Sequence, residues 1–180
     1  MPFCYPPSAS GAHRYPLHIG QLFRTAMDAR SGDTILGSDG HHRSYPEFGR
    51  RVHRLAHVLT ELGVEAGDVV AVMDWDSHRY LECYFAVPMM GAVLQMVNVR
   101  LSPDQIAYTL KSTGVRVVLF HADFGPLVAQ LAARLPQLQR FVLLHDGQAA
   151  ESPVLVAGEY ETLLAAAPEA FAFADVDEEA

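Results

Sequence analysis

The stretch VVAVM at residues 69–73 decides the fold class, because five apolar residues follow one another there without a polar position. A strand that is apolar on both faces is typical of a buried parallel sheet with helices on either side. The sequence before it predicts a helix, since apolar residues recur at helical spacing over 48–62 and Gly63 can end the helix. Ser44 and Glu47 fit a capping box at its start. A helix that leads into such a strand indicates an α/β fold.

The same alternation continues toward the C-terminus. A helix begins near His78 and is expected to be stopped or kinked by Pro88. Ser102 and Gln105 fit a second capping box with proline between them, and Gly114 can end that helix. The short connections imply right-handed crossovers and a mainly parallel sheet flanked by helices. The other predicted elements are strands at 93–97, 117–120 and 141–144, and helices at 127–135 and 159–166.

A β-hairpin is predicted near the N-terminus. Asp39-Gly40 is a dipeptide that supplies the positive φ of a tight turn, and strands are expected on both sides of it, at 34–38 and 41–45. A short amphipathic helix is expected before the hairpin, from residue 17 to about residue 27.

The composition along the chain divides it into three parts. Residues 1–16 hold four prolines and are expected to form a flexible tail. Residues 17–167 carry the helix and strand patterns and form the α/β domain. Residues 168–180 are rich in acids and contain no base, so they are expected to form an acidic tail or linker.

The overall composition excludes several classes of protein. Half of the residues are hydrophobic and 19% are charged, as in a globular domain. The net charge of −8 argues against nucleic acid or an anionic membrane as the main partner. We find no secretory signal and no transmembrane segment, and Cys4 and Cys83 lie in surroundings too different to predict a disulfide. A cytoplasmic protein is therefore expected.

The motifs of nucleotide chemistry are absent from the sequence. The loop after the first buried strand, residues 74–77, has no glycine, so it is not a G-x-G-x-x-G dinucleotide turn. No G-x-x-x-x-G-K-[ST] phosphate loop occurs, and Lys111, the only lysine, lies late in a predicted helix. No serine lies in a G-x-S-x-G elbow, and neither cysteine has a neighbouring base. We therefore assign no catalytic, cofactor-binding or metal-binding residue.

One pair of histidines has the spacing of metal ligands. His53 and His57 are four residues apart on one predicted helix. Their neighbours oppose a cation, because three of them are arginines: Arg50, Arg51 and Arg54. The favoured interpretation is a solvated basic face of the helix.

A denser polar group follows the first buried strand and consists of Asp74, Asp76, His78 and Glu82. In the functional interpretation it is a carboxylate and histidine cluster at the carboxyl end of a strand, where open α/β sheets bind ligands. In the favoured, simpler interpretation Asp76 or Ser77 caps the following helix. Glu82 then pairs with Arg79 or His78 along that helix.

Two smaller groups complete the candidates. Met89, Met90 and Met96 could line an adaptable acyl pocket, although packing in the core explains them better. His41 and His42 follow the hairpin turn and are expected to be exposed.

Several strings occur in one order between residues 44 and 120: SYPEF at 44–48, GDVVA at 67–71, HRYLE at 78–82, AVP at 86–88 and NVRLSP at 98–103. Together they resemble the N-terminal portion of adenylate-forming (AMP-binding) acyl-CoA synthetases, and in particular the medium- and long-chain fatty acid–CoA ligases. The resemblance extends through Tyr160 and Glu161 to the acidic end. The chain departs from the family's pattern at Val99, where proline is frequent, and at Met89, where glycine is common.

The resemblance implies a reaction in two steps. A carboxylate attacks the α-phosphate of Mg-ATP to give an acyl-adenylate and pyrophosphate, and the sulfur of coenzyme A then displaces AMP to give the thioester. ATP, Mg²⁺ and CoA are thus implied for the full-length enzyme, and a fatty or other small carboxylic acid as substrate. The family's phosphate loop, Mg-binding glutamate and catalytic lysine have no matching position here. Residues 168–180 would lead toward the ATP-binding subdomain, and a homodimer is possible because some relatives form one.

Two hypotheses follow. In the first, the chain is the N-terminal part of an AMP-forming fatty acid–CoA ligase, is inactive by itself, and exposes an apolar patch that a second subdomain would cover. In the second, it is a stand-alone, non-catalytic binding or regulatory module on the same scaffold. The coding sequence beyond Ala180 separates them, because only the first requires an in-frame continuation.

Overall fold

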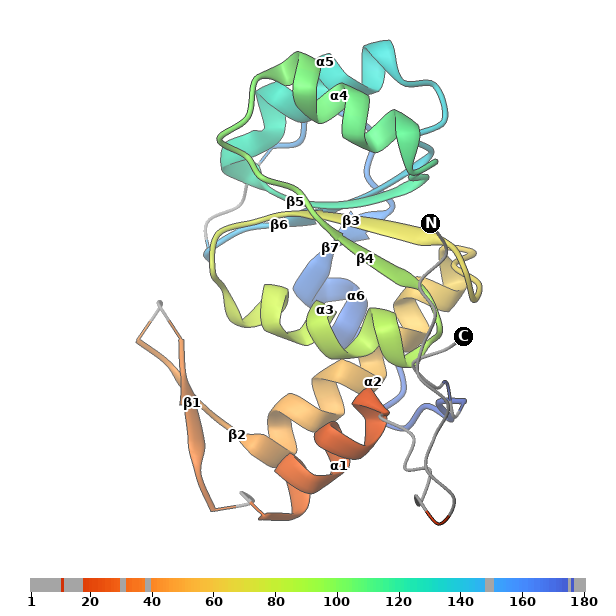
Figure 1. Ribbon diagram of the computed structural model, residues 1–180. Coiled ribbons are helices and arrows are strands. Elements are labelled where there is room, and N and C mark those ends of the chain that lie inside the picture. Colours follow the sequence, from red (N-terminus) through yellow and green to blue (C-terminus); the bar gives the residue numbers. More distant parts are fainter. Residues whose placement is uncertain are drawn as a thin grey trace.

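A five-stranded, fully parallel sheet forms the centre of the molecule (Figure 1). The computed structural model describes residue 11 and residues 18–29, 32–37, 40–147, 151–174 and 176. In sequence order the strands are β3 (Val69–Met73), β4 (Val93–Met96), β5 (Val117–His121), β6 (Arg140–Leu144) and β7 (Gly158–Glu159). Their spatial order is β4-β3-β5-β6-β7. The predicted α/β class with a mainly parallel sheet is confirmed.

Helices cover both faces of this sheet (Figure 1). One face packs against α2 (Tyr45–Glu61), α3 (His78–Met89) and α6 (Tyr160–Ala166). The other packs against α4 (Pro103–Ser112) and α5 (Gly125–Arg134), the latter preceded by a short 3-10 turn, η1 (Ala122–Phe124). Outside α2 lie α1 (Ile19–Ala29) and the predicted antiparallel hairpin of β1 (Thr34–Leu36) and β2 (His42–Ser44).

The strands β3, β5 and β6 are apolar on both sides because each contributes side chains to two hydrophobic cores. Val70 and Val72 of β3 belong to the cluster on the α2, α3 and α6 side, whereas Ala71 and Met73 belong to the cluster under α4 and α5. All four are fully buried. Successive side chains of a strand point to opposite faces. The run that decided the fold class is therefore apolar throughout because helices cover it on both sides.

The predicted starts and ends of α2 and α4 agree with the structure. The Ser44 hydroxyl accepts the Glu47 N–H at 3.2 Å, and Ser102 and Gln105 form a complete, reciprocal capping box. Gly63 follows α2 with φ +79°, a conformation that favours glycine over other residues. Local signals were sufficient to place both helices.

Two elements differ from the prediction. α3 is not stopped before Pro88 but runs through it to Met89. A proline in the last turn removes one N–H bond only, and the Met90 N–H still reaches the Ala86 carbonyl at 3.2 Å. The second difference is β7, a two-residue strand that was not predicted, because two residues show no periodicity.

The chain after α6 runs back along α2. We call residues 169–174 and 176 the return segment; in it Phe171 and Phe173 are half-buried. The predicted flexible tail at 1–16, the hairpin residue Asp39 and Cys4 lie outside the described residues, apart from Gly11. Within the described part of the chain, no helix is both long and apolar enough to cross a membrane.

Candidate functional site

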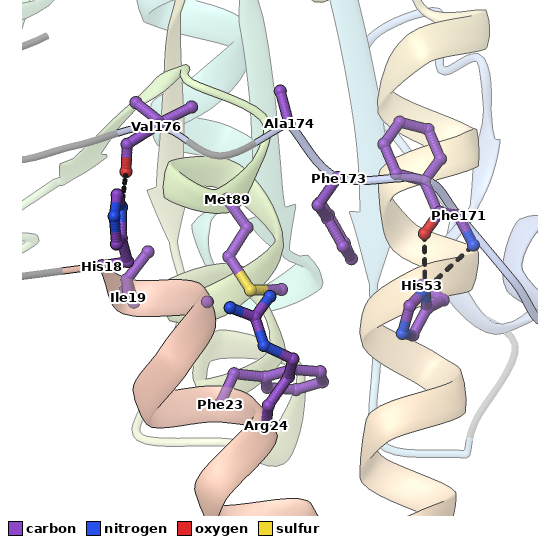
Figure 2. A pocket seen from close by; sticks show the side chains of 11 residues that line it. His18, Ile19, Phe23, Arg24, His53, Met89, Phe171, Phe173, Ala174 and Val176 are labelled. Atoms are coloured by element: carbon purple, nitrogen blue, oxygen red, sulfur yellow. Dashed lines mark hydrogen bonds between the residues drawn. The ribbon is translucent and has the colours of Figure 1, made fainter.

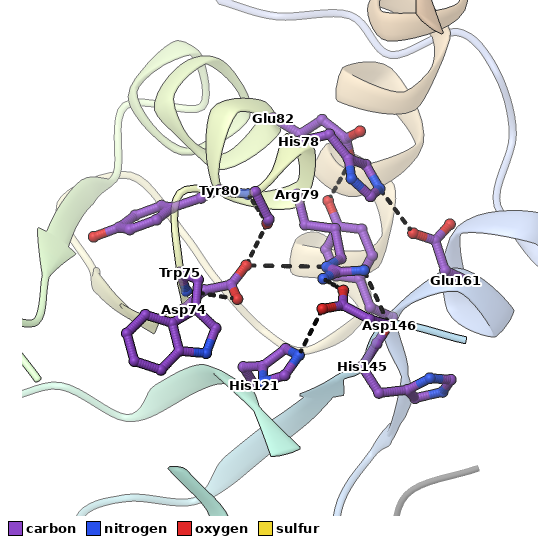
Figure 3. Close-up of polar contacts among 12 residues, drawn as sticks. Asp74, Trp75, His78, Arg79, Tyr80, Glu82, His121, His145, Asp146 and Glu161 are labelled. Carbon is purple, nitrogen blue, oxygen red and sulfur yellow. Dashed lines mark hydrogen bonds and ion pairs between the residues drawn. The ribbon is translucent and has the colours of Figure 1, made fainter. Parts of the chain in front are cut away.

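Charged side chains gather where the parallel strands end. Asp74 follows β3, His121 is the last residue of β5, and Asp146 lies two residues after β6. Figure 3 shows these three around Arg79, which comes from α3. We call these four residues the carboxyl-edge cluster. Ligands of open α/β sheets bind at this edge, which makes the cluster the candidate functional site.

Arg79 connects the members of the cluster. Its side chain is 4% exposed, and its Nη2 donates to Asp146 Oδ1 at 2.6 Å. Its Nη1 donates to the carbonyl of His145 at 3.0 Å, and its Nε lies 3.9 Å from Asp74 Oδ2. Arg79 therefore ties the loop after β6 to the start of α3.

The two carboxyl groups of the cluster differ in proton affinity. Burial raises the pKa of Asp74, against the opposing effects of Ser77 and Arg79. The hydrogen bond from Arg79 lowers the pKa of Asp146, which is largely exposed. Separated pKa values are a requirement for acid–base catalysis. However, Asp74 accepts the Trp75 N–H at 2.8 Å through Oδ1 and the Ser77 hydroxyl through Oδ2. Both carboxylate oxygens of Asp74 therefore accept hydrogen bonds at the start of α3.

His121 completes the cluster from β5. Its Nδ1 accepts the Asp123 N–H at 3.3 Å, and its Nε2 lies 3.5 Å from Asp146 Oδ2. Among the described residues, His121 Nε2 and Arg79 Nε are the buried side-chain polar atoms without a hydrogen-bond partner. The cluster orders three loops at one edge but offers no nucleophile.

A second polar network lies deeper, between helices of one face. It consists of Arg51 from α2, His78 and Glu82 from α3, and Tyr160 and Glu161 from α6, and we call it the inter-helix ion cluster. Arg51 Nε donates to Glu82 Oε1 at 2.6 Å, and its Nη1 donates to Glu161 Oε2 at 2.7 Å. Tyr160 donates its hydroxyl proton to Glu82 Oε2 at 2.6 Å. One arginine thus holds three helices together.

Burial and hydrogen bonds together set the charge states in this network. Glu82 is fully buried, and a buried carboxylate needs charged or hydrogen-bonding partners. Burial alone would raise the pKa of Glu161, but the hydrogen bonds from His78 and Arg51 outweigh it and lower that pKa to about 2. Burial raises the pKa of Tyr160, which therefore stays a hydrogen-bond donor at neutral pH. The network is a set of fixed ion pairs and hydrogen bonds, not a proton-transfer site.

The structure separates the polar group that the sequence placed after the first buried strand. The Ser77 hydroxyl accepts the Tyr80 N–H at 3.2 Å, which confirms the capping interpretation. The predicted pairing of Glu82 with Arg79 or His78 is wrong. Glu82 points toward α2 and binds Arg51, because it lies on the buried side of α3.

His53 and His57 do not form the freely solvated face that we expected. Both are half-buried under the return segment, and His57 Nε2 donates to the Ala170 carbonyl at 2.7 Å. His53 Nδ1 accepts the Phe171 N–H at 2.9 Å. Within the described residues, no group of three or more His, Cys, Asp or Glu side chains could hold a metal ion.

The remaining candidates take separate places. Met89 is buried, as expected of a core residue, and Met90 packs against the same core, but Met96 is 55% exposed on the edge strand β4. Lys111 is exposed in the last turn of α4. Cys83 is fully buried, and burial raises the pKa of its thiol, so it is not a ready nucleophile.

The residues that sequence reasoning missed lie far apart along the chain. Arg51 and Tyr160 meet only through the fold, and nothing local marks them as partners. His121 and Asp146 could have been found, since each stands at or just after the end of a predicted strand and the carboxyl ends share one edge.

The described residues at the carboxyl ends of the strands do not fit a nucleoside triphosphate. The loop after β3 contributes Asp74 and Asp76, Asp123 follows β5, and Asp146 follows β6. Carboxylates at these positions repel phosphate groups, and no glycine-rich loop presents backbone N–H groups there.

Comparison with known proteins identifies the class. Over 91% of this chain and 31% of the other, the fold superimposes with a TM-score of 0.81 on the crystal structure of the anthranilate CoA ligase AuaEII, at 20% sequence identity. The sequence profile of the AMP-binding enzymes matches residues 23–173. The chain therefore belongs to the AMP-binding enzyme family.

Curated relatives lie within the same family. A long-chain-fatty-acid–CoA ligase of Thermus thermophilus is 43% identical over 106 residues, which cover 59% of this chain and 20% of that protein. A medium-chain-fatty-acid–CoA ligase of Ectopseudomonas oleovorans is 33% identical over 172 residues, which cover 92% of this chain and 31% of that protein. The chain thus spans between a fifth and a third of the length of these relatives.

Proposed function

We propose that this chain is the N-terminal part of an ATP-dependent, AMP-forming fatty acid–CoA ligase. The observation that carries the proposal is the 33% identity to a medium-chain-fatty-acid–CoA ligase along 92% of the chain. The family match at residues 23–173 supports it. In this reaction a carboxylate becomes an acyl-adenylate, and coenzyme A then displaces AMP to form the thioester.

The chain's contribution is a scaffold. The inter-helix ion cluster fixes α2, α3 and α6 against one face of the sheet, and Arg79 fixes the loops at the carboxyl edge. We place the binding of ATP, Mg²⁺ and CoA on residues of the enzyme outside this chain, because the carboxylates at the edge do not suit phosphate. The 180 residues are therefore proposed to be inactive by themselves.

The acyl group is proposed to be a fatty acid, on the strength of the long-chain and medium-chain relatives. Proteins named 3-methylmercaptopropionyl-CoA ligase and feruloyl-CoA synthase are also similar to this chain, which supports the proposal that this part of the enzyme does not by itself select the acid. We further propose that the enzyme is cytoplasmic, because ATP and CoA are supplied in the cytoplasm. We also propose that it forms a homodimer, which sedimentation would test by measuring the mass of the assembly.

The test begins with the coding sequence beyond Ala180. We expect an in-frame continuation that encodes a Thr-, Ser- and Gly-rich loop containing a lysine. The complete product, incubated with decanoate, ATP and CoA, is expected to release AMP and form decanoyl-CoA. A genomic stop codon directly after Ala180, or a complete product that forms no acyl-CoA from any fatty acid, would contradict the proposal.

A further inference from the structure

A small apolar cavity lies between α1, the end of α3 and the return segment. It measures about 180 Å³ and is walled by Ile19, Phe23, Met89, Phe171 and Phe173 (Figure 2). These five residues come from three places in the sequence, and all of them except Phe171 belong to or pack against the buried core. The cavity is therefore formed by the tertiary fold.

The return segment forms one wall of this cavity and is held by histidines. Phe171 donates its N–H to His53 Nδ1 at 2.9 Å, and His18 Nδ1 donates to the Val176 carbonyl at 2.8 Å. The Phe173 ring lies 5.1 Å from the His53 ring, measured between centroids. Because backbone groups make both hydrogen bonds, the segment has a defined position over the cavity.

An arginine borders this apolar space. Figure 2 shows the Arg24 guanidinium lying over Phe23 and beside the Met89 sulfur. Among the described residues, no carboxylate lies within ion-pair distance of Arg24. An arginine without an acidic partner beside apolar walls is complementary to an anionic group on an apolar molecule.

His53 lines the cavity from α2. Its Nδ1 lies 2.9 Å from the Phe171 nitrogen and 3.2 Å from the Phe171 carbonyl oxygen, so the ring is held against the backbone of the return segment (Figure 2). Burial lowers the pKa of His53, so its ring is neutral at neutral pH. The ring therefore adds no positive charge to that of Arg24.

We propose that this cavity binds a small amphipathic carboxylate, with its head at Arg24 and its apolar tail among Phe23, Met89 and Phe173. Its size of about 180 Å³ sets the tail length. An apolar protein cavity of roughly 150 Å³ holds a benzene molecule, so a tail of about six carbons fits. The inference goes beyond the proposed ligase function and does not rest on it.

The test titrates the 180-residue chain, labelled with carbon-13 at its methionine methyl groups, with three six-carbon probes that differ only in the head group. Hexanoate is expected to shift the Met89 methyl resonance and to saturate. 1-Hexanol is expected to bind more weakly at the same place, and hexylammonium at least about tenfold more weakly than hexanoate, because Arg24 repels it. Equal affinity for hexanoate and hexylammonium, or no shift at Met89, would overturn the proposal.

Two variants locate the head and the tail. Arg24→Gln is expected to weaken hexanoate at least about fivefold and to leave 1-hexanol unchanged. Arg140→Gln is the matched control, since Arg140 is an exposed arginine of β6 whose side chain contacts only a carbonyl in the described structure. This substitution should change the affinity for neither hexanoate nor 1-hexanol. Phe173→Ala should weaken both ligands. Unchanged hexanoate binding in Arg24→Gln would refute the assignment. None of these measurements requires acyl-CoA formation, so their failure would leave the ligase proposal standing.

Discussion

The two faces of the sheet are covered by helices in different ways. Under α4 and α5, every described buried residue of the two helices is apolar or glycine, and the ion pair that joins them, Arg134 with Asp104, lies at the surface. Under α2, α3 and α6, the apolar core is interrupted by Arg51, Glu82 and Tyr160. One face is held by non-directional burial, and the other also by directional contacts between charged groups.

This difference follows from the lengths of the elements. α4 and α5 each have 10 residues and bury an apolar stripe, whereas α6 has only 7 residues. A short helix buries little apolar area and cannot select its position by burial alone. The contacts of Arg51 with Glu82 and Glu161 specify where α6 docks, although 110 residues separate Arg51 from Glu161.

The largest expected effect comes from removing the central cation. Arg51→Met leaves the fully buried Glu82 without its ion-pair partner, and breaking a buried pair in this way lowers the free energy of unfolding by about 3–5 kcal/mol. Urea denaturation measures the change. The neighbouring exposed arginine gives the control, because Arg50→Met should stay within about 0.5 kcal/mol. Equal effects of the two substitutions would remove the distinction between the faces.

The apolar face should respond to lost volume. Leu131→Ala in α5 removes a side chain that is 1% exposed and should cost about 2–5 kcal/mol, from the lost burial of the side chain and from the cavity that remains. The same denaturation experiment on Leu155→Ala, at a residue 93% exposed, should show almost no change. If Leu131→Ala were also neutral, α5 would not be held by packing.

A smaller effect is expected from one hydroxyl. Tyr160→Phe removes the donor to Glu82 Oε2 while both contacts of Glu82 with Arg51 remain. Hydrogen bonds to charged groups contribute about 1.5–3 kcal/mol, so the loss should be smaller than that of Arg51→Met. Tyr108→Phe, at an exposed position of α4, serves as the matched variant and should be silent in thermal unfolding. A Tyr160→Phe protein as stable as the parent would show that the hydroxyl contributes nothing.

The smallest expected effect is a loss of stability at low pH. The pKa of Glu161 is lowered from 4.5 to about 2 in the folded chain, so its contribution is complete above pH 4.5 and is lost as the pH falls toward 2. Thermal melts across this window should show a falling Tm. In Glu161→Gln the fall should be shallower, because that group no longer titrates. Parallel curves for parent and variant would contradict the lowered pKa.

The sequence predicted most of the fold because its signals are local. Apolar runs located β3, β5 and β6 almost to the residue, and the capping serines located the starts of α2 and α4. β7 was missed because a two-residue strand exists only through its pairing with β6. Local patterns therefore predict elements but not pairings of this kind.

The side-chain contacts between helices were harder to predict, because they join residues that lie far apart in the sequence. Glu82 looked like a member of an exposed helical ion pair, because its partner Arg51 lies 31 residues away on another helix. His53 had the spacing of a metal ligand, yet it accepts a backbone N–H from Phe171, 118 residues later. Contacts at such separations depend on the sheet that brings the helices together, and no periodicity in the sequence encodes them.

We propose that this chain supplies scaffold, and not chemistry, to a ligase of the AMP-binding family. ATP–pyrophosphate exchange with decanoate tests it most directly, since exchange requires formation of an acyl-adenylate. The purified 180-residue chain is expected to show no exchange above a protein-free blank, while the complete gene product shows it under the same conditions. Clear, decanoate-dependent exchange by the 180-residue chain alone would contradict the account.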